Sequence, residues 1–120
     1  MNFKYTYEDL SNIETAFFDC LVHSKLSSPE IFFIGQGIKR YIETDLEDFL
    51  DSSSRAKISE FAMYVTAERH SYILSFVGKL ISDLELLIRQ TQSIYWYDEY
   101  KKWLGNLEYV RKELEAKRPI

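Results

Sequence analysis

Apolar residues recur every three or four positions through most of this chain, and this spacing constrains its fold more than any other feature. A period of this kind places one apolar stripe along each helix, and that stripe has to be buried against a neighbour. No alternating strand pattern and no hairpin turn signal stands out against it. The sequence therefore predicts an all-α fold, an antiparallel bundle of four to six helices that forms a single helical domain over residues 1–120.

Capping residues divide the first half of the chain into two predicted helices. Thr6 can cap a helix over 7–25, whose early carboxylates suit the positive end of a helix dipole. Ser28 and Pro29 suit the cap and the first position of a second helix, which ends by about residue 51.

Two glycines and a second capping signal lie inside this second helix. Gly35 and Gly37 each cost about 1 kcal/mol relative to alanine in a helix interior, so we expect either a kink or a close approach to another helix. The segment Thr44–Glu47 resembles a capping box and would divide the helix near residue 43.

The second half of the chain contains one very long apolar period and one aromatic helix. Residues 51–54 predict a loop and a cap, after which the helical period continues over 54–92. A helix of that length is unusual, and the stripe lapses at 67–71, where we predict a break or kink. The last helix begins near Ser93.

Negative charge is concentrated in the first half of the chain. The formal charge is −4 for the 120 residues, with −6 on residues 1–54 and +2 on residues 55–120. Nucleic acid is therefore not expected as a ligand, since it requires a basic surface. The densest group is an acidic ridge, defined by Glu43, Asp45, Glu47, Asp48 and Asp51. Apolar residues alternate with these carboxylates, which predicts that the ridge lies on the outer face of its helix as a solvated or partner-binding surface.

The last helix is unusually aromatic, with five aromatic residues within 95–103. Trp96, Tyr100 and Trp103 lie on its apolar stripe and are expected in the core. Tyr95 and Tyr97 point elsewhere and are either additional core residues or anchors for a protein partner.

Two groups of side chains are of the types used in catalysis. Cys20 and His23 lie three residues apart on one helix surface, but Cys20 falls on the apolar stripe and is interpreted as core. Glu68, Arg69 and His70 are consecutive and are interpreted as a polar kink, with a helical hydrolase or nuclease site as the alternative. Glu-x-x-His pairs and nucleotide-binding or hydrolase motifs are absent from the sequence. We therefore expect no enzymatic activity, no metal and no cofactor.

The single cysteine, the absence of a secretory signal and the absence of a membrane-spanning apolar run predict a cytosolic protein without a membrane partner. In its size, acidity and composition the chain resembles small bacterial immunity proteins of the contact-dependent inhibition and colicin type. The resemblance implies a basic toxin domain, such as a nuclease, as the partner of the acidic ridge, Tyr95 and Tyr97. A phage-encoded inhibitor of the anti-CRISPR kind and a homodimeric helical scaffold are the alternatives, and the chain is expected to be a monomer or a homodimer.

Overall fold

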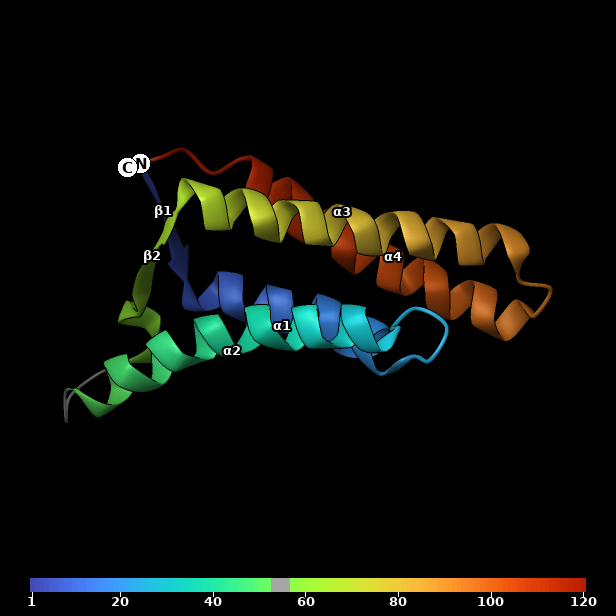
Figure 1. Ribbon diagram of the computed structural model, residues 1–120, viewed down its shortest axis with the longest axis horizontal. Coiled ribbons are helices and arrows are strands. Elements are labelled where there is room, and N and C mark those ends of the chain that lie inside the picture. Colours follow the sequence, from blue (N-terminus) through green and yellow to red (C-terminus); the bar gives the residue numbers. More distant parts are fainter. Residues whose placement is uncertain (53–56) are drawn as a thin grey trace.

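The computed structural model describes residues 1–52 and 57–120, which form four long helices and a two-stranded sheet (Figure 1). The elements follow in the order β1 (Asn2–Thr6), α1 (Tyr7–Val22), α2 (Pro29–Asp51), the short 3-10 helix η1 (Ile58–Glu60), β2 (Ala62–Thr66), α3 (Ala67–Gln90) and α4 (Ile94–Glu115). The fold is thus predominantly α, as predicted. The prediction of a purely all-α fold is wrong, because the chain also forms a sheet.

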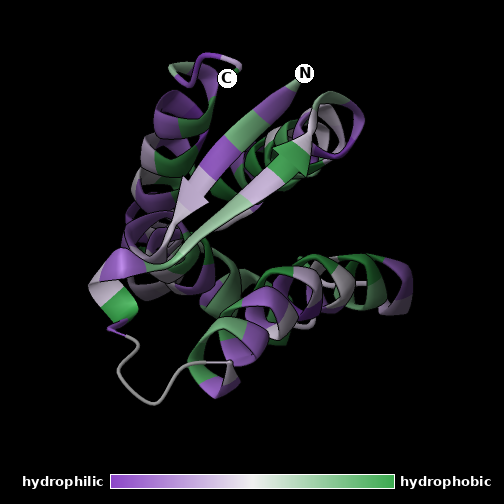
Figure 2. Ribbon diagram, turned by 90° about the vertical axis from the view of Figure 1, so that its left-hand side faces the viewer, coloured by the Kyte–Doolittle hydropathy of each residue, from purple (hydrophilic) through white to green (hydrophobic). Residues whose placement is uncertain are grey.

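The sheet pairs β1 with β2 in antiparallel register and lies at one end of the helices (Figure 1 and Figure 2). In β1, Tyr5 is buried and the preceding Lys4 is exposed. In β2, Met63 and Val65 are buried and Tyr64 between them is exposed, so burial alternates with a period of two. The predicted helix before residue 67 is therefore wrong in the described part of the chain. Phe61 and Val65 are four residues apart and fit a helical stripe as well, and five residues are too few to separate the two periods.

Each strand leads directly into a helix through a capping threonine. The side chain of Thr6 accepts a hydrogen bond from the N–H of Asp9, and the Asp9 carboxylate accepts one from the N–H of Thr6 at 2.8 Å. Thr66 likewise accepts from the N–H of Arg69, so the chain changes from β2 to α3 just before the break predicted at 67–71, and residues 67–71 themselves are helical. As a result the described chain runs twice through the order strand, helix, helix.

The predicted helix starts at Pro29 and near Ser93 are confirmed. The side chain of Ser28 accepts from the N–H of Ile31, and that of Ser93 accepts from the N–H of Trp96. The first helix ends at Val22, before the predicted residue 25. The part of the predicted cap at residues 53 and 54 lies outside the described residues.

α2 runs unbroken from Pro29 to Asp51, so the predicted division near residue 43 is wrong. Its two glycines differ. A Cβ on Gly35 would lie 2.5 Å from Cδ2 of Leu21, which confirms the predicted close approach between α2 and α1. A Cβ on Gly37 would meet no atom within 4 Å.

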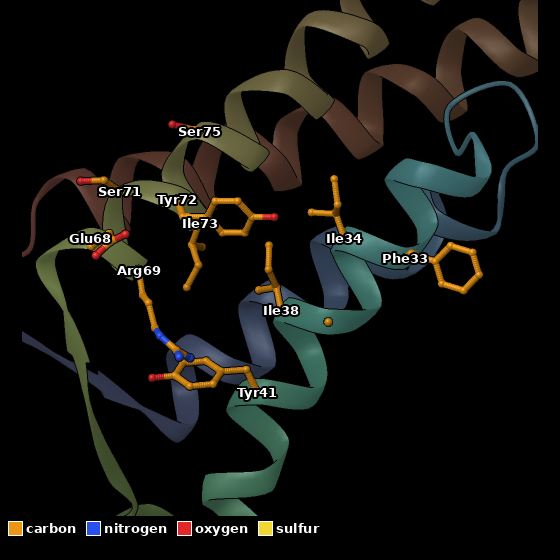
Figure 3. A pocket seen from close by; sticks show the side chains of 11 residues that line it. Phe33, Ile34, Ile38, Tyr41, Glu68, Arg69, Ser71, Tyr72, Ile73 and Ser75 are labelled. Carbon is orange, nitrogen blue, oxygen red and sulfur yellow. The ribbon is translucent and has the colours of Figure 1, made fainter.

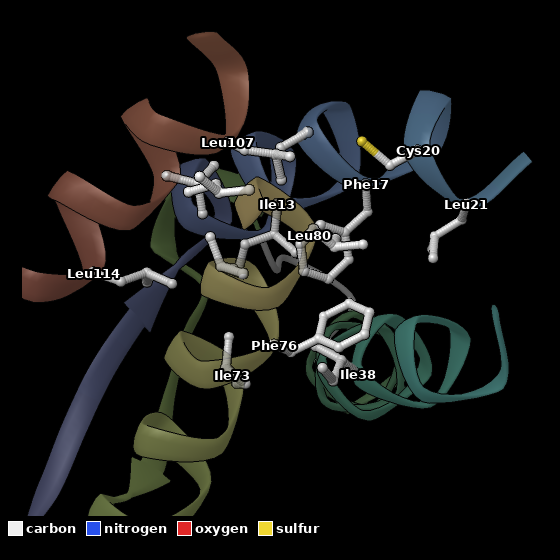
Figure 4. Close-up of a cluster of buried hydrophobic side chains, with 14 of the residues drawn as sticks. Ile13, Phe17, Cys20, Leu21, Ile38, Ile73, Phe76, Leu80, Leu107 and Leu114 are labelled. Carbon is white, nitrogen blue, oxygen red and sulfur yellow. The ribbon is translucent and has the colours of Figure 1, made fainter. Parts of the chain in front are cut away.

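The core lies between the helices and includes residues from all four of them (Figure 4). The rings of Phe17 on α1 and Phe76 on α3 meet edge to face at 5.4 Å, with Ile38 of α2 and Leu107 of α4 in the same cluster. The last buried residue of α2 is Ile42. In the part of the helix that follows, residues 43–51, only the half-buried Leu46 and Phe49 pack against the core.

Candidate functional site

The acidic ridge occupies the C-terminal part of α2, which projects past the start of α1 (Figure 1). Here Leu46 and Phe49 are only half-buried, and Phe49 meets Phe61 edge to face at 5.8 Å. Glu43 is half-buried, and the other four carboxylates of the ridge are exposed, in agreement with the predicted outer face. The ridge is thus presented on a helical segment that lies beyond the main core.

The charges of the ridge lie at an unfavourable end of their helix. The last turn of α2 contains no basic residue, so Asp48 and Asp51 face the negative end of the helix dipole. None of the five ridge carboxylates forms an ion pair with a residue that the structure describes. Carboxylates placed this way cost roughly 0.3–1 kcal/mol each. Folding alone therefore does not explain why they are there.

Glu43 connects the ridge to α1. A side-chain hydrogen bond with Glu43 raises the pKa of Glu14, and burial and the negative charge of Glu43 add to this effect, while Lys39 opposes it. A raised carboxyl pKa is the response expected when two acids lie close together in a negative potential. This pair extends the acidic surface from α2 onto the neighbouring helix.

A groove of about 670 Å³ lies between α2 and α3, next to the ridge (Figure 3). Its lining is mainly apolar, with Ile34 and Ile38 on one side and Ile73 on the other. Two large aromatic side chains at the groove remain exposed to solvent, Phe33 by 72% and Tyr72 by 53%. Sequence reasoning missed this groove. The available signal was the run of four apolar residues that includes Phe33, since four consecutive residues of a helix cannot all face one core.

The predicted group Glu68, Arg69 and His70 is divided between two sides of α3. Glu68 and Arg69 line the groove, and the Arg69 guanidinium lies 4.3 Å from the centre of the Tyr41 ring (Figure 3). His70 is buried instead and shares a 2.8 Å hydrogen bond with the Tyr5 hydroxyl. The three side chains therefore do not converge on one cavity.

His70 is a structural residue at the junction of α3 with the sheet. Its ring stacks on Phe3 with 3.9 Å between centroids. Burial, and then the charge of Lys117, lowers the pKa of His70, which favours the neutral form of the ring. Its contacts explain why a polar side chain is tolerated on the inner face of the helix.

The pair Cys20 and His23 also separates into structural roles. Cys20 is buried in the core, as predicted, and burial raises the pKa of its thiol to about 12, which disfavours the reactive thiolate. His23 follows the last residue of α1 as its C-cap and lies among three aromatic rings, with its Nε2 3.4 Å from the Tyr100 hydroxyl. Within residues 1–52 and 57–120, no three His, Cys, Asp or Glu side chains are grouped so as to hold a metal ion.

The structure does not bring Tyr95 and Tyr97 to the acidic ridge. They are 65% and 44% exposed, but they lie on the first turn of α4, at the opposite end of the molecule from the end of α2 (Figure 1). Trp96, expected in the core, is 38% exposed and stacks on Tyr100. The exposed aromatic residues Phe33 and Tyr72 of the groove lie nearer to the ridge than these tyrosines do.

Protein-family models, curated proteins and solved structures were compared with this chain, and none of them matches it. Among the described residues, no helix is both long enough and apolar enough to cross a bilayer.

Proposed function

We propose that this chain is a protein-binding inhibitor that recognises a basic partner through the acidic ridge of α2. The observation that carries this proposal is the placement of the ridge. Exposed carboxylates crowd the negative end of a projecting helix, and none of them forms an ion pair with a described residue. That arrangement costs stability in the free protein and becomes favourable when a positive surface approaches.

The partner class that best fits this chemistry is a nucleic-acid-processing enzyme, such as a nuclease toxin domain. The active-site groove of such an enzyme is basic because it binds phosphates. A row of carboxylates can occupy that groove in place of phosphates, and their field accelerates association at low ionic strength. The inhibitor would then cover the active site without performing any chemistry itself.

Affinity capture with matched charge reversals tests this proposal. The tagged chain is used to capture proteins from its host, alongside the variant Glu47→Lys/Asp48→Lys. The control is Glu108→Lys/Glu113→Lys, which makes the same charge change at exposed positions of α4. We expect a basic protein that is retained by the wild type and the control and is lost by the ridge variant.

Either of two results would contradict the proposal. Capture of the same proteins by the ridge variant would show that the ridge is only a solvated face. A clean homodimer with no captured protein would favour the self-associating scaffold instead. Where a basic partner is captured, its identity distinguishes a toxin domain from a nuclease targeted by a phage inhibitor.

A further inference from the structure

The two strand–helix–helix halves of the chain differ at one helix contact. In each half one helix follows the strand, α1 or α3, and a second helix follows it, α2 or α4. α4 packs closely along α1, but the backbones of α2 and α3, the pair in the corresponding positions, stay farther apart, and these two helices meet only through side chains such as Arg69 and Tyr41. The groove lies between these two helices. It is therefore the place where a helix–helix contact made elsewhere in the fold is missing.

The shape of the groove suits a helix better than a small molecule. Its rim leaves Phe33 and Tyr72 more than half exposed, whereas small-molecule pockets enclose most of their ligand. Gly37 lines the groove and presents no side chain to it, so a backbone or a bulky side chain can approach α2 closely there. An apolar helix face laid between α2 and α3 would cover the exposed ring of Tyr72, which points into the groove, and would pass Phe33 at its edge (Figure 3).

The apolar stripe of the groove continues into the acidic ridge. Ile34, Ile38 and Tyr41 are followed by Asp45 and Asp48, alternately four and three residues apart. This spacing keeps all five residues on one face of α2, over a length of roughly 21 Å at 1.5 Å per residue. One side of the helix is thus apolar for its first half and acidic for its second.

We propose that the groove between α2 and α3 binds an amphipathic helix of the basic partner. The apolar face of that helix lies between α2 and α3, and lysine or arginine side chains at one of its ends lie beside Asp45 and Asp48. This is the helix-in-groove mode of recognition, in which apolar anchors give affinity and the charged end sets the orientation. The inference rests on the proposed function, because it names the part of the basic partner that α2 recognises.

A displayed peptide library tests this inference directly. The library contains helical peptides of about 20 residues with leucines fixed at positions i, i+4, i+7 and i+11 and all other positions randomised. We expect selection on the intact chain to enrich peptides with lysine or arginine clustered at one end of the leucine stripe. No enrichment, or enrichment of basic peptides whose leucines can be scattered without loss of binding, would overturn the inference.

Two glycine variants then locate the binding site. Gly37→Leu fills the groove, whereas Gly105→Leu makes the same change in α4, where a Cβ also meets no atom within 4 Å. By fluorescence anisotropy we expect Gly37→Leu to weaken binding of a selected peptide by at least about tenfold and Gly105→Leu to leave it unchanged. Asp45→Lys/Asp48→Lys should weaken the binding of a basic peptide at low salt. The same variant should bind more tightly a peptide in which glutamates replace the basic residues.

The captured natural partner separates failure of this inference from failure of the proposed function. If Gly37→Leu retains a partner that the ridge variant loses, the ridge is a binding surface and the groove is not. If the ridge variant retains every partner, the proposed function fails first. If the wild type is a dimer and Gly37→Leu is a monomer, a second copy of this chain occupies the groove, and the inference is overturned.

Discussion

The contact between Gly35 and Leu21 gives the sharpest test of the packing of α2 on α1. A Cβ on Gly35 would lie 2.5 and 2.7 Å from the two Leu21 methyl carbons and 3.2 Å from Leu21 Cγ. Leu21 is only 3% exposed, so it has little free space into which to move. Gly35→Ala therefore has two opposing effects on the free energy of unfolding: the higher helix propensity of alanine stabilises the fold, and the overlap of its Cβ with Leu21 destabilises it.

The relative size of these two effects predicts whether Gly35→Ala stabilises or destabilises the fold. Alanine gains about 1 kcal/mol over glycine in a helix interior, and overpacking costs about 1–3 kcal/mol. We expect Gly35→Ala to lower the free energy of unfolding by about 0–2 kcal/mol. Gly37→Ala in the same helix should raise it by about 0.5–1 kcal/mol, because its Cβ meets no atom within 4 Å.

A double-mutant cycle measured by urea denaturation isolates the overlap. In a Leu21→Ala background the methyl carbons are gone, so Gly35→Ala should become stabilising, with a coupling energy of about 1–3 kcal/mol. Equal stabilisation by Gly35→Ala and Gly37→Ala, or a cycle without coupling, would refute the close approach of the two helices.

Three further predictions concern charge. Asp48→Lys and Asp51→Lys should each raise the free energy of unfolding by roughly 0.3–1 kcal/mol in thermal denaturation, because they reverse an unfavourable interaction with the α2 dipole; a loss of stability would contradict that account. Burial lowers the pKa of His70 below its usual 6.5, so the unfolded chain binds a proton at this histidine more readily than the folded protein does. The full free energy of unfolding should therefore be present above about pH 6.5 and should decrease as the pH falls below that value. Urea titrations at about pH 7.5 and about pH 5.5 should show this fall in the wild type and a smaller one in His70→Gln, and equal pH dependence would count against it. Lys117→Met should cost about 1–3 kcal/mol in urea, since Lys117 is mostly buried and 2.8 Å from the Asp9 carboxylate, whereas Lys102→Met, from the exposed pair with Glu99, should cost under about 1 kcal/mol.

The helices and the ridge were predictable because local chemistry decides them. Ser28 and Ser93 satisfy free N–H groups of the turn that follows them, so the starts of α2 and α4 depend on only a few neighbouring residues. The alternation of carboxylates with Leu46 and Phe49 likewise indicated which side of α2 is acidic. Cys20 could be assigned to the core on the same grounds, since a helical stripe has only one buried side.

The sheet, the groove and the separation of the proposed surfaces depend on the tertiary structure. β1 forms because β2, some sixty residues later in the chain, supplies its hydrogen-bond partners, and a five-residue strand carries too short a period to reveal this. Likewise, periodicity places Phe33 and Tyr72 on helices but does not say how far α2 lies from α3, and that separation decides whether a groove exists. The sequence also does not determine which ends of α2 and α4 lie near each other, and in the structure Tyr95 and the acidic ridge lie at opposite ends of the molecule (Figure 1). Capping hydrogen bonds and the apolar stripe of a helix depend on residues that are close in sequence, so the sequence alone predicts them. A groove depends on the relative placement of elements that are distant in sequence, so only the tertiary structure determines it.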